Sequence, residues 1–271
     1  MNLKSISRFV KRYYFIIGII ICVLFVALVS FYKLFISKPV YVYTKVKLGQ
    51  GLWWAQVAKP NIWMISQIKK GDSAKDLTGK KIVEVLSVTH YPVWGSDQFD
   101  TYLSLKLKVS QQKTTKNYLF NRDTLAVGSP IDLSFPTFAS AGTVTQLSEK
   151  PLDEKNKEKI ITLVKRLAFP WEFDAIQIGD SYFDGESNIF EVLDKKYSDS
   201  IEYSIESVPN LPAGAEARRY IEVKARIKVV EKDNQMVFGE EQLIKKGKGI
   251  NISTSNFTFN EYIVSDIQPA S

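Results

Sequence analysis

Residues 71–86 read GDSAKDLTGKKIVEVL, and residues 179–193 read GDSYFDGESNIFEVL. Both stretches open on Gly-Asp-Ser and close on Glu-Val-Leu, so a turn followed by a strand pattern occurs twice in one chain. The run YLSLKLKV at 102–109 is likewise matched by YIEVKARI at 220–227. The spacing grows from 108 residues (71 to 179) to 118 (102 to 220), which predicts two copies of one module with a few loop insertions.

Apolar and polar residues alternate along much of the chain after residue 40, as in VYVYTKVKL at 40–48. Such runs bury one face of a strand and leave the other in solvent. Gly, Asn, Asp and Pro separate the runs at a spacing typical of antiparallel barrels and sandwiches. We therefore expect a mainly β fold with two similar antiparallel β-barrel or β-sandwich modules, at 40–149 and 170–271.

The segment between these modules, residues 151–169, has a helical pattern instead. Lys and Glu fill one side of the pattern, and Pro170 follows it. This arrangement is typical of an amphipathic helix and predicts a connecting helix between the two modules. The apolar positions of the pattern are Ile160, Ile161, Leu163, Val164 and Leu167.

The net charge of +7 belongs to the N-terminus. The first 50 residues carry eight Lys and Arg and no acidic residue, which leaves 28 basic against 29 acidic residues for 51–271. A neutral body lacks the basic face that a phosphate backbone requires. Nucleic acid is therefore excluded as an expected partner.

Residues 13–32 read YYFIIGIIICVLFVALVSFY, 20 residues without a charge. About 20 apolar residues at ~1.5 Å rise cross the ~30 Å core of a bilayer. A cleaved signal peptide is the alternative, but the best cut, after Ser30, places Leu28 where a small residue is needed. We expect a cytoplasmic basic tail at 1–12 and a transmembrane helix at 13–37 that binds the lipid bilayer.

The expected location is the plasma (inner) membrane, with one span, a cytoplasmic N-terminus and an extracytoplasmic C-terminal body. Lysines lie on both sides of the span, so the positive-inside count is nearly balanced and the orientation depends on the short basic tail. Cys22 is the only cysteine and lies in the span, so the body has no disulfide.

Catalytic motifs are absent from the sequence. His90 is the only histidine, which excludes multi-histidine metal sites and leaves one possible imidazole base. No nucleophile elbow, P-loop or dinucleotide fingerprint occurs. We therefore expect a protein that is not an enzyme and has no cofactor, with His90 as a loop residue.

One loop of the second copy carries oxygen ligands at a spacing that a hard cation accepts, at Asp180, Asp184 and Glu186. The corresponding loop of the first copy contains Lys80, which would oppose a cation. A solvated turn is the alternative interpretation, because Gly supplies a positive φ and Asp caps its own backbone.

Tryptophans concentrate in the first module, at Trp53, Trp54, Trp63 and Trp94. A tryptophan offers a flat surface for a sugar or for a protein partner, so these four are candidate contacts. The alternatives are that they form the core of the module or seat it against the bilayer.

The blocks IKKGDS at 68–73, GKKIVEVL at 79–86, LAVGSPIDL at 125–133 and GTVTQL at 142–147 follow one another after the apolar segment. In this order the chain resembles a bacterial family of single-pass membrane-anchored proteins with a β domain of unknown function, over roughly 40–148 and more faintly 171–267. A weaker likeness is to the β domains of periplasmic adaptor proteins, although their coiled-coil hairpin is missing. The resemblance implies no catalytic residues.

The expected function is that of a non-enzymatic, membrane-anchored adaptor or scaffold of the cell envelope. Its extracytoplasmic β modules would bind an envelope or membrane protein, with the polar insertion at 198–217 as a candidate contact. One alternative is an envelope glycan-binding module that uses the tryptophans of the first module. Another is an accessory subunit of a transport or secretion complex.

Overall fold

The computed structural model describes residues 14–16, 18–30, 40–49, 59–76, 79–93, 97–112, 114–152, 156–199 and 218–270. The chain divides into two units, Met1–Val40 and Tyr41–Ser271, and each is considered by itself.

In the first unit residues 14–16 and 18–30 are helical and exposed, and Val40 begins strand β1 (Val40–Leu48). Among the described residues, no helix has the length and apolar character needed to cross a membrane. The expected span at 13–37 and the basic tail at 1–12 lie partly or wholly outside the described residues.

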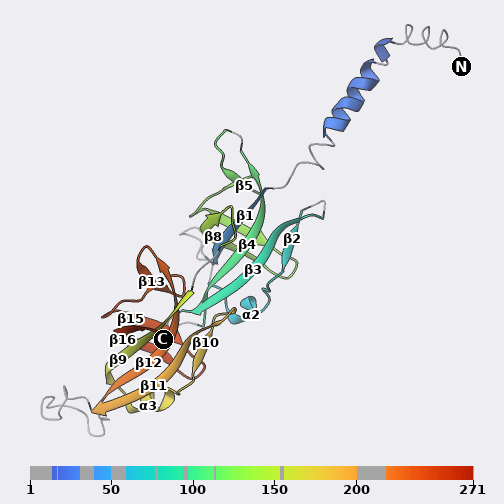
Figure 1. Ribbon diagram of the computed structural model, residues 1–271. Coiled ribbons are helices and arrows are strands. Elements are labelled where there is room, and N and C mark those ends of the chain that lie inside the picture. The colour runs from blue at the N-terminus through green and yellow to red at the C-terminus, as the bar shows by residue number, and fades with distance from the viewer. Residues whose placement is uncertain are drawn as a thin grey trace. The chain divides into compact units, whose positions relative to one another are not determined.

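The second unit contains two curled antiparallel sheets (Figure 1), so the prediction of a mainly β protein with two similar modules is confirmed. The described elements of the first module are β1 (Val40–Leu48), α2 (Ile62–Ile65), β2 (Ser73–Lys75), β3 (Lys81–Pro92), β4 (Phe99–Gln111), β5 (Tyr118–Phe120), β6 (Asp123–Leu125), β7 (Pro130–Ser134) and β8 (Ala139–Ser148). Those of the second module are β9 (Asn156–Ala168), α3 (Pro170–Ala175), β10 (Ser181–Phe183), β11 (Asn188–Asp199), β12 (Arg219–Lys232), β13 (Gln235–Phe238), β14 (Gln242–Leu243), β15 (Gly249–Ser253) and β16 (Thr258–Pro269).

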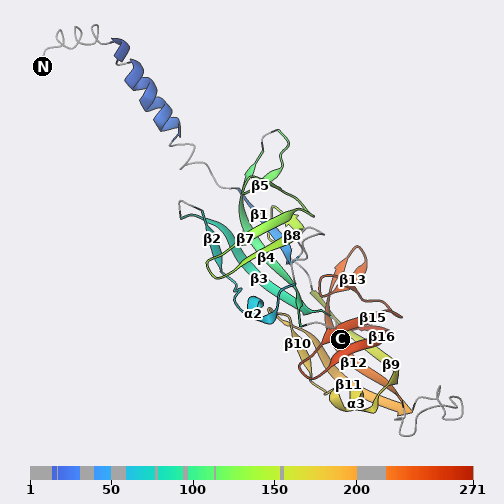
Figure 2. The same cartoon turned by 180° about the vertical axis from the view of Figure 1, so that it is seen from behind.

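The two modules have one topology. The strand order is β2-β3-β4-β1-β8-β7 in the first and β10-β11-β12-β9-β16-β15 in the second, so each strand of one has its counterpart in the other. A short hairpin is added to each sheet, β5–β6 beside β4 and β13–β14 beside β12. Figure 2 shows β7 beside β8 and β15 beside β16 at the matching sheet edges.

The repeated Gly-Asp turns make the same hydrogen bonds in both copies. Gly71 N–H donates to Val85 O, and Gly179 N–H donates to Val192 O, both at 2.8 Å. Both glycines have φ of +91°, a conformation that side chains disfavour. The Gly-Asp-Ser motif is therefore a structural turn that fixes the start of β2 and β10.

The predicted connecting helix at 151–169 is wrong, because residues 156–168 form strand β9. Ile161 and Leu163 are fully buried at alternate positions, as a strand requires. β9 lies in the middle of its sheet and pairs with β12 on one side and β16 on the other. The second module therefore begins at β9, the counterpart of β1, and not at residue 170.

The strand pairing shows that one sequence match between the two copies is displaced by two residues. Val85 pairs with Leu105 in the first module, and Val192 pairs with Ala225 in the second. Leu105 therefore corresponds to Ala225, whereas the match of 102–109 with 220–227 aligns Leu107 with Ala225. A shift of two residues keeps every side chain on the same face of the sheet, so alternation alone cannot detect it.

Each module has its own hydrophobic core. Leu103, Leu105 and Leu107 on β4 are fully buried in the first core. The second core contains a cluster of aromatic rings, where Phe259 packs edge-to-face against Phe190 and Tyr262. Tyr91 is an exception, because it belongs to β3 but packs against the core of the second module.

Candidate functional site

The end of β3 is covered by the loop between β10 and β11. His90 N–H donates to Asp184 O at 2.8 Å, and the Tyr182 hydroxyl donates to His90 O at 2.8 Å. Gly185 approaches so closely that a Cβ atom there would lie 2.5 Å from Val88 O. Because real Cβ atoms do not approach a carbonyl so closely, only glycine fits this contact between the modules.

The ring of His90 is part of the same contact. Its Nδ1 atom lies 3.0 Å from the Tyr182 oxygen. Since the Tyr182 proton goes to His90 O, Nδ1 must carry the ring proton and donate. Burial lowers the pKa of His90, and the nearby Asp184 carboxylate opposes this only in part, so the ring is neutral at pH 7. His90 lies in a strand and not in the expected loop.

Two buried lysines of β1 reach the second module. Lys45 Nζ lies 2.7 Å from Glu240 Oε1, and Lys47 Nζ lies 2.6 Å from Glu241 Oε1. A lysine in the interior requires such a partner, because an unpaired buried charge is costly. Glu240 has a φ of +72° in the turn after β13, and this strained backbone is tolerated where its carboxylate meets Lys45.

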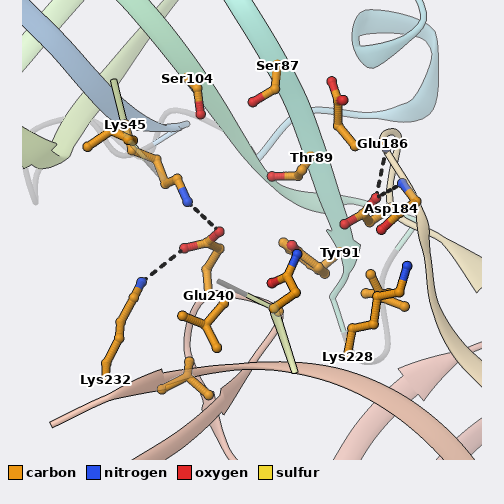
Figure 3. A pocket seen from close by; sticks show the side chains of 17 residues that line it. Lys45, Ser87, Thr89, Tyr91, Ser104, Asp184, Glu186, Lys228, Lys232 and Glu240 are labelled. Carbon is orange, nitrogen blue, oxygen red and sulfur yellow. Dashed lines mark hydrogen bonds and ion pairs between the residues drawn. The ribbon is translucent and has the colours of Figure 1, made fainter. Parts of the chain in front are cut away.

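Beside these contacts the modules enclose a polar pocket of about 310 Å³ (Figure 3). Three neighbouring strands of the first module supply one wall, with Lys45 on β1, Ser87 on β3 and Ser104 on β4. The second module supplies the opposite wall, including Lys228 on β12 and Glu240. The remaining lining residues are Thr89, Tyr91, Leu152, Asn156, Asp184, Glu186, Ser187, Ile189, Val230, Lys232, Val237 and Gly239.

A second hollow, of about 700 Å³, lies on the other side of the contact between Tyr91 and Gly239. Tyr102 lines it, and its buried hydroxyl faces the carboxylate of Glu241. Burial, and then the facing Glu241 carboxylate, raise the pKa of Tyr102, so this hydroxyl keeps its proton. The carboxylates that line the hollow include Asp100, which is paired with Lys47 at 3.1 Å.

The candidate cation ligands do not form one site. Asp180 Oδ1 accepts from Asn256 Nδ2 at 2.6 Å, and Asp184 Oδ1 accepts the N–H groups of Glu186 and Ser187, both at 2.8 Å. These carboxylates cap turns of the chain. In the described part of the chain, no three or more His, Cys, Asp or Glu side chains could together hold a metal ion.

Among the candidate tryptophans, Trp53, Trp54 and Trp94 lie outside the described residues. Trp63 lies on α2 with 67 % of its surface exposed and lines neither hollow. The core interpretation therefore does not hold for Trp63. The insertion at 198–217 also lies almost wholly outside the described residues.

Trp63 has a counterpart that sequence reasoning missed. Trp171 on α3 lies 108 residues later, which is the same spacing that separates the two Gly-Asp-Ser turns, and it is 57 % exposed. That spacing was the signal that could have revealed the pair. Over residues 61–73 and 169–181 the copies share five identical positions. These are Trp63/Trp171, Ile68/Ile176, Gly71/Gly179, Asp72/Asp180 and Ser73/Ser181.

Comparison of the chain with protein-family models, curated proteins and solved structures found no match. The resemblance to a bacterial membrane-anchored family therefore stays a prediction.

Proposed function

We propose that this protein is a non-catalytic adaptor of the cell envelope that binds a protein partner through the equivalent tryptophans of its two modules. The single observation that carries the proposal is the exposure of Trp63 and Trp171 at equivalent positions of the short helices α2 and α3, which precede the duplicated Gly-Asp-Ser turns. Exposed tryptophans are unusual, and tryptophan is enriched among the residues that dominate binding at protein interfaces.

Two of the other four identical pairs in this segment have a structural reason to stay the same. Ile68 and Ile176 are buried in the two cores, and Gly71 and Gly179 have a positive φ. Packing gives no such reason for the exposed Trp63. Its retention beside divergent neighbours therefore supports a role in binding.

Two copies of one contact surface on a single chain favour a bivalent interaction. When the first contact has formed, the second occurs at a high effective concentration, so weak contacts can give a stable complex. Membrane attachment would concentrate the protein in the same way. The uncharged run at 13–32 supports attachment with a cytoplasmic N-terminus and an extracytoplasmic body.

The test is affinity capture of the full-length chain from membranes in mild detergent, followed by mass spectrometry. We expect a stoichiometric envelope or membrane protein that is lost from the Trp63→Ala/Trp171→Ala double variant and weakened in each single variant. Val127→Ala is the matched control, since Val127 is 64 % exposed but its counterpart, Lys246, is not apolar. Equal capture by the double variant would overturn the proposal.

A further inference from the structure

The charges that line the pocket of Figure 3 balance. Three lysines (Lys45, Lys228 and Lys232) face three carboxylates (Asp184, Glu186 and Glu240). Glu240 is held at 2.7 Å from Lys45 and 3.6 Å from Lys232. Neither an anion nor a cation would therefore gain a net attraction, and a neutral ligand fits the wall best.

Hydroxyl groups that make no hydrogen bond with the described residues line the same pocket. They belong to Ser87, Thr89, Ser104 and Ser187, and none has a side-chain hydrogen-bond partner in the described part of the chain. A hydroxyl donates one hydrogen bond and accepts two, so this wall matches a ligand that is itself rich in hydroxyl groups.

The second module carries charged residues at the positions equivalent to Ser87 and Ser104. In both copies a register shift interrupts the pairing of the two strands, and the first pair after it is Ser87–Ser104 in one and Asp194–Lys224 in the other. Charged residues at these positions are typical of a solvated face. In the first module two small serine side chains stand at these positions. They leave space beside the sheet, and the second module covers that space.

Apolar side chains complete the lining. Ile189, Val230 and Val237 come from the second module, beside the ring of Tyr91. A sugar ring combines hydroxyl groups with an apolar C–H face, and aromatic and aliphatic side chains cover such a face. The volume of about 310 Å³ lies at the small end of the roughly 300–1,000 Å³ of ligand pockets.

We propose that this pocket between the modules binds a neutral sugar or polyol of about the size of one sugar ring. The hydroxyls of Ser87, Thr89 and Ser104 hold the ligand hydroxyls, and Tyr91 contacts its apolar face. The ligand touches both modules and therefore stabilises their contact. This site is separate from Trp63 and Trp171 and does not depend on the adaptor proposal.

The test is calorimetric titration of the full-length chain with D-glucose, N-acetyl-D-glucosamine and myo-inositol. The detergent must have no sugar headgroup, since such a headgroup would itself compete. We expect at least one of these probes to bind with a Kd of about 1 mM or tighter. D-glucuronate and D-glucosamine, which carry a charge, should bind more weakly. A disaccharide that contains the bound sugar is then tested. Binding of the disaccharide would indicate the end of a glycan chain, and binding of the single sugar alone would indicate a free sugar.

Variants locate the binding site. Ser87→Ala and Ser104→Ala should each weaken binding roughly fivefold, the effect of one lost hydrogen bond. Ser110→Ala is the matched control, because Ser110 lies on the same strand as Ser104, is exposed and does not line the pocket. Ser104→Leu fills the pocket and should abolish binding, with thermal unfolding used to check that each variant folds. No binding of any neutral probe, stronger binding of a charged one, or unchanged binding in the serine variants would overturn the proposal.

Discussion

Lys45 Nζ lies 2.7 Å from Glu240 Oε1, although 195 positions separate the two residues in the chain. Only 6 % of the Lys45 side chain and 10 % of the Glu240 side chain are exposed. The pair joins a central strand of the first sheet to a hairpin of the second. Because it lies at the edge of the sugar pocket, it also fixes the charge balance of that pocket.

Glu240→Ala should destabilise the protein by about 3 kcal/mol, because it leaves Lys45 charged and poorly compensated in the interior. Urea unfolding of the variant beside the parent chain measures the change in the free energy of unfolding. The control is Glu231→Ala, which removes the exposed ion pair with Lys157 and should cost less than about 1 kcal/mol. Equal effects of the two substitutions would contradict a buried ion pair between the modules.

Gly185→Ala should cost about 3 kcal/mol, because the strain of a side chain at φ +111° adds to an overlap with Val88 O. Gly179→Ala separates these effects, since Gly179 also has a positive φ but a Cβ atom there meets nothing within 4 Å. That substitution should cost only about 1 kcal/mol. Thermal unfolding of both variants gives the comparison, and an equal loss would mean that the loop does not press against β3.

The repeat and the alternating strands could be read from the sequence, but β9 could not. Its apolar positions at Ile160, Ile161, Leu163 and Val164 satisfy a helical period as well as an alternating one. Pairing with strands on both sides decided the outcome, and such long-range pairing is invisible in a local pattern. The topology identifies β9 as a strand, because each copy needs a central strand and β9 is the counterpart of β1.

The site was hidden for a related reason. Lys45 and Lys47 follow the apolar segment closely, so the sequence places them among the lysines that flank a membrane span. The structure instead buries both lysines against acidic residues of the second module. Nothing in the sequence near Ser87 or Ser104 indicates a pocket. Its walls come from both modules, and only their docking brings these walls together.

The stability of the protein should depend on the charge of His90, the only histidine in the chain. Burial lowers the pKa of His90 below its ordinary value of 6.5, so the unfolded chain takes up a proton at a higher pH than the folded one. Stability is therefore full above pH 6.5 and falls as the pH drops below it, by at most about 1.4 kcal/mol per pH unit.

Urea unfolding between pH 8 and pH 5.5 measures this dependence. His90→Asn should remove it, because the Asn amide can donate to Tyr182 as Nδ1–H does but does not titrate. A parent chain whose stability stays constant over this range would show that His90 is not held in its neutral form.

Trp63→Ala and Trp171→Ala should change stability far less than substitutions at the buried isoleucines of the same turns. Trp63 is exposed, so its loss should cost less than about 1 kcal/mol. Trp171 should cost somewhat more, because its ring centroid lies 6.2 Å from that of Phe169 and 6.4 Å from that of Phe257. Ile68→Ala should cost about 2–5 kcal/mol, since it leaves a cavity in a core.

Ile176→Ala provides the same comparison in the second module, and urea unfolding of all four variants ranks them. The expected order places both isoleucines above both tryptophans. If Trp63→Ala proved as costly as Ile68→Ala, packing alone would account for the retention of tryptophan in both copies. The tryptophans would then no longer be candidate contact residues, whereas the proposal of a sugar pocket between the modules would be unaffected.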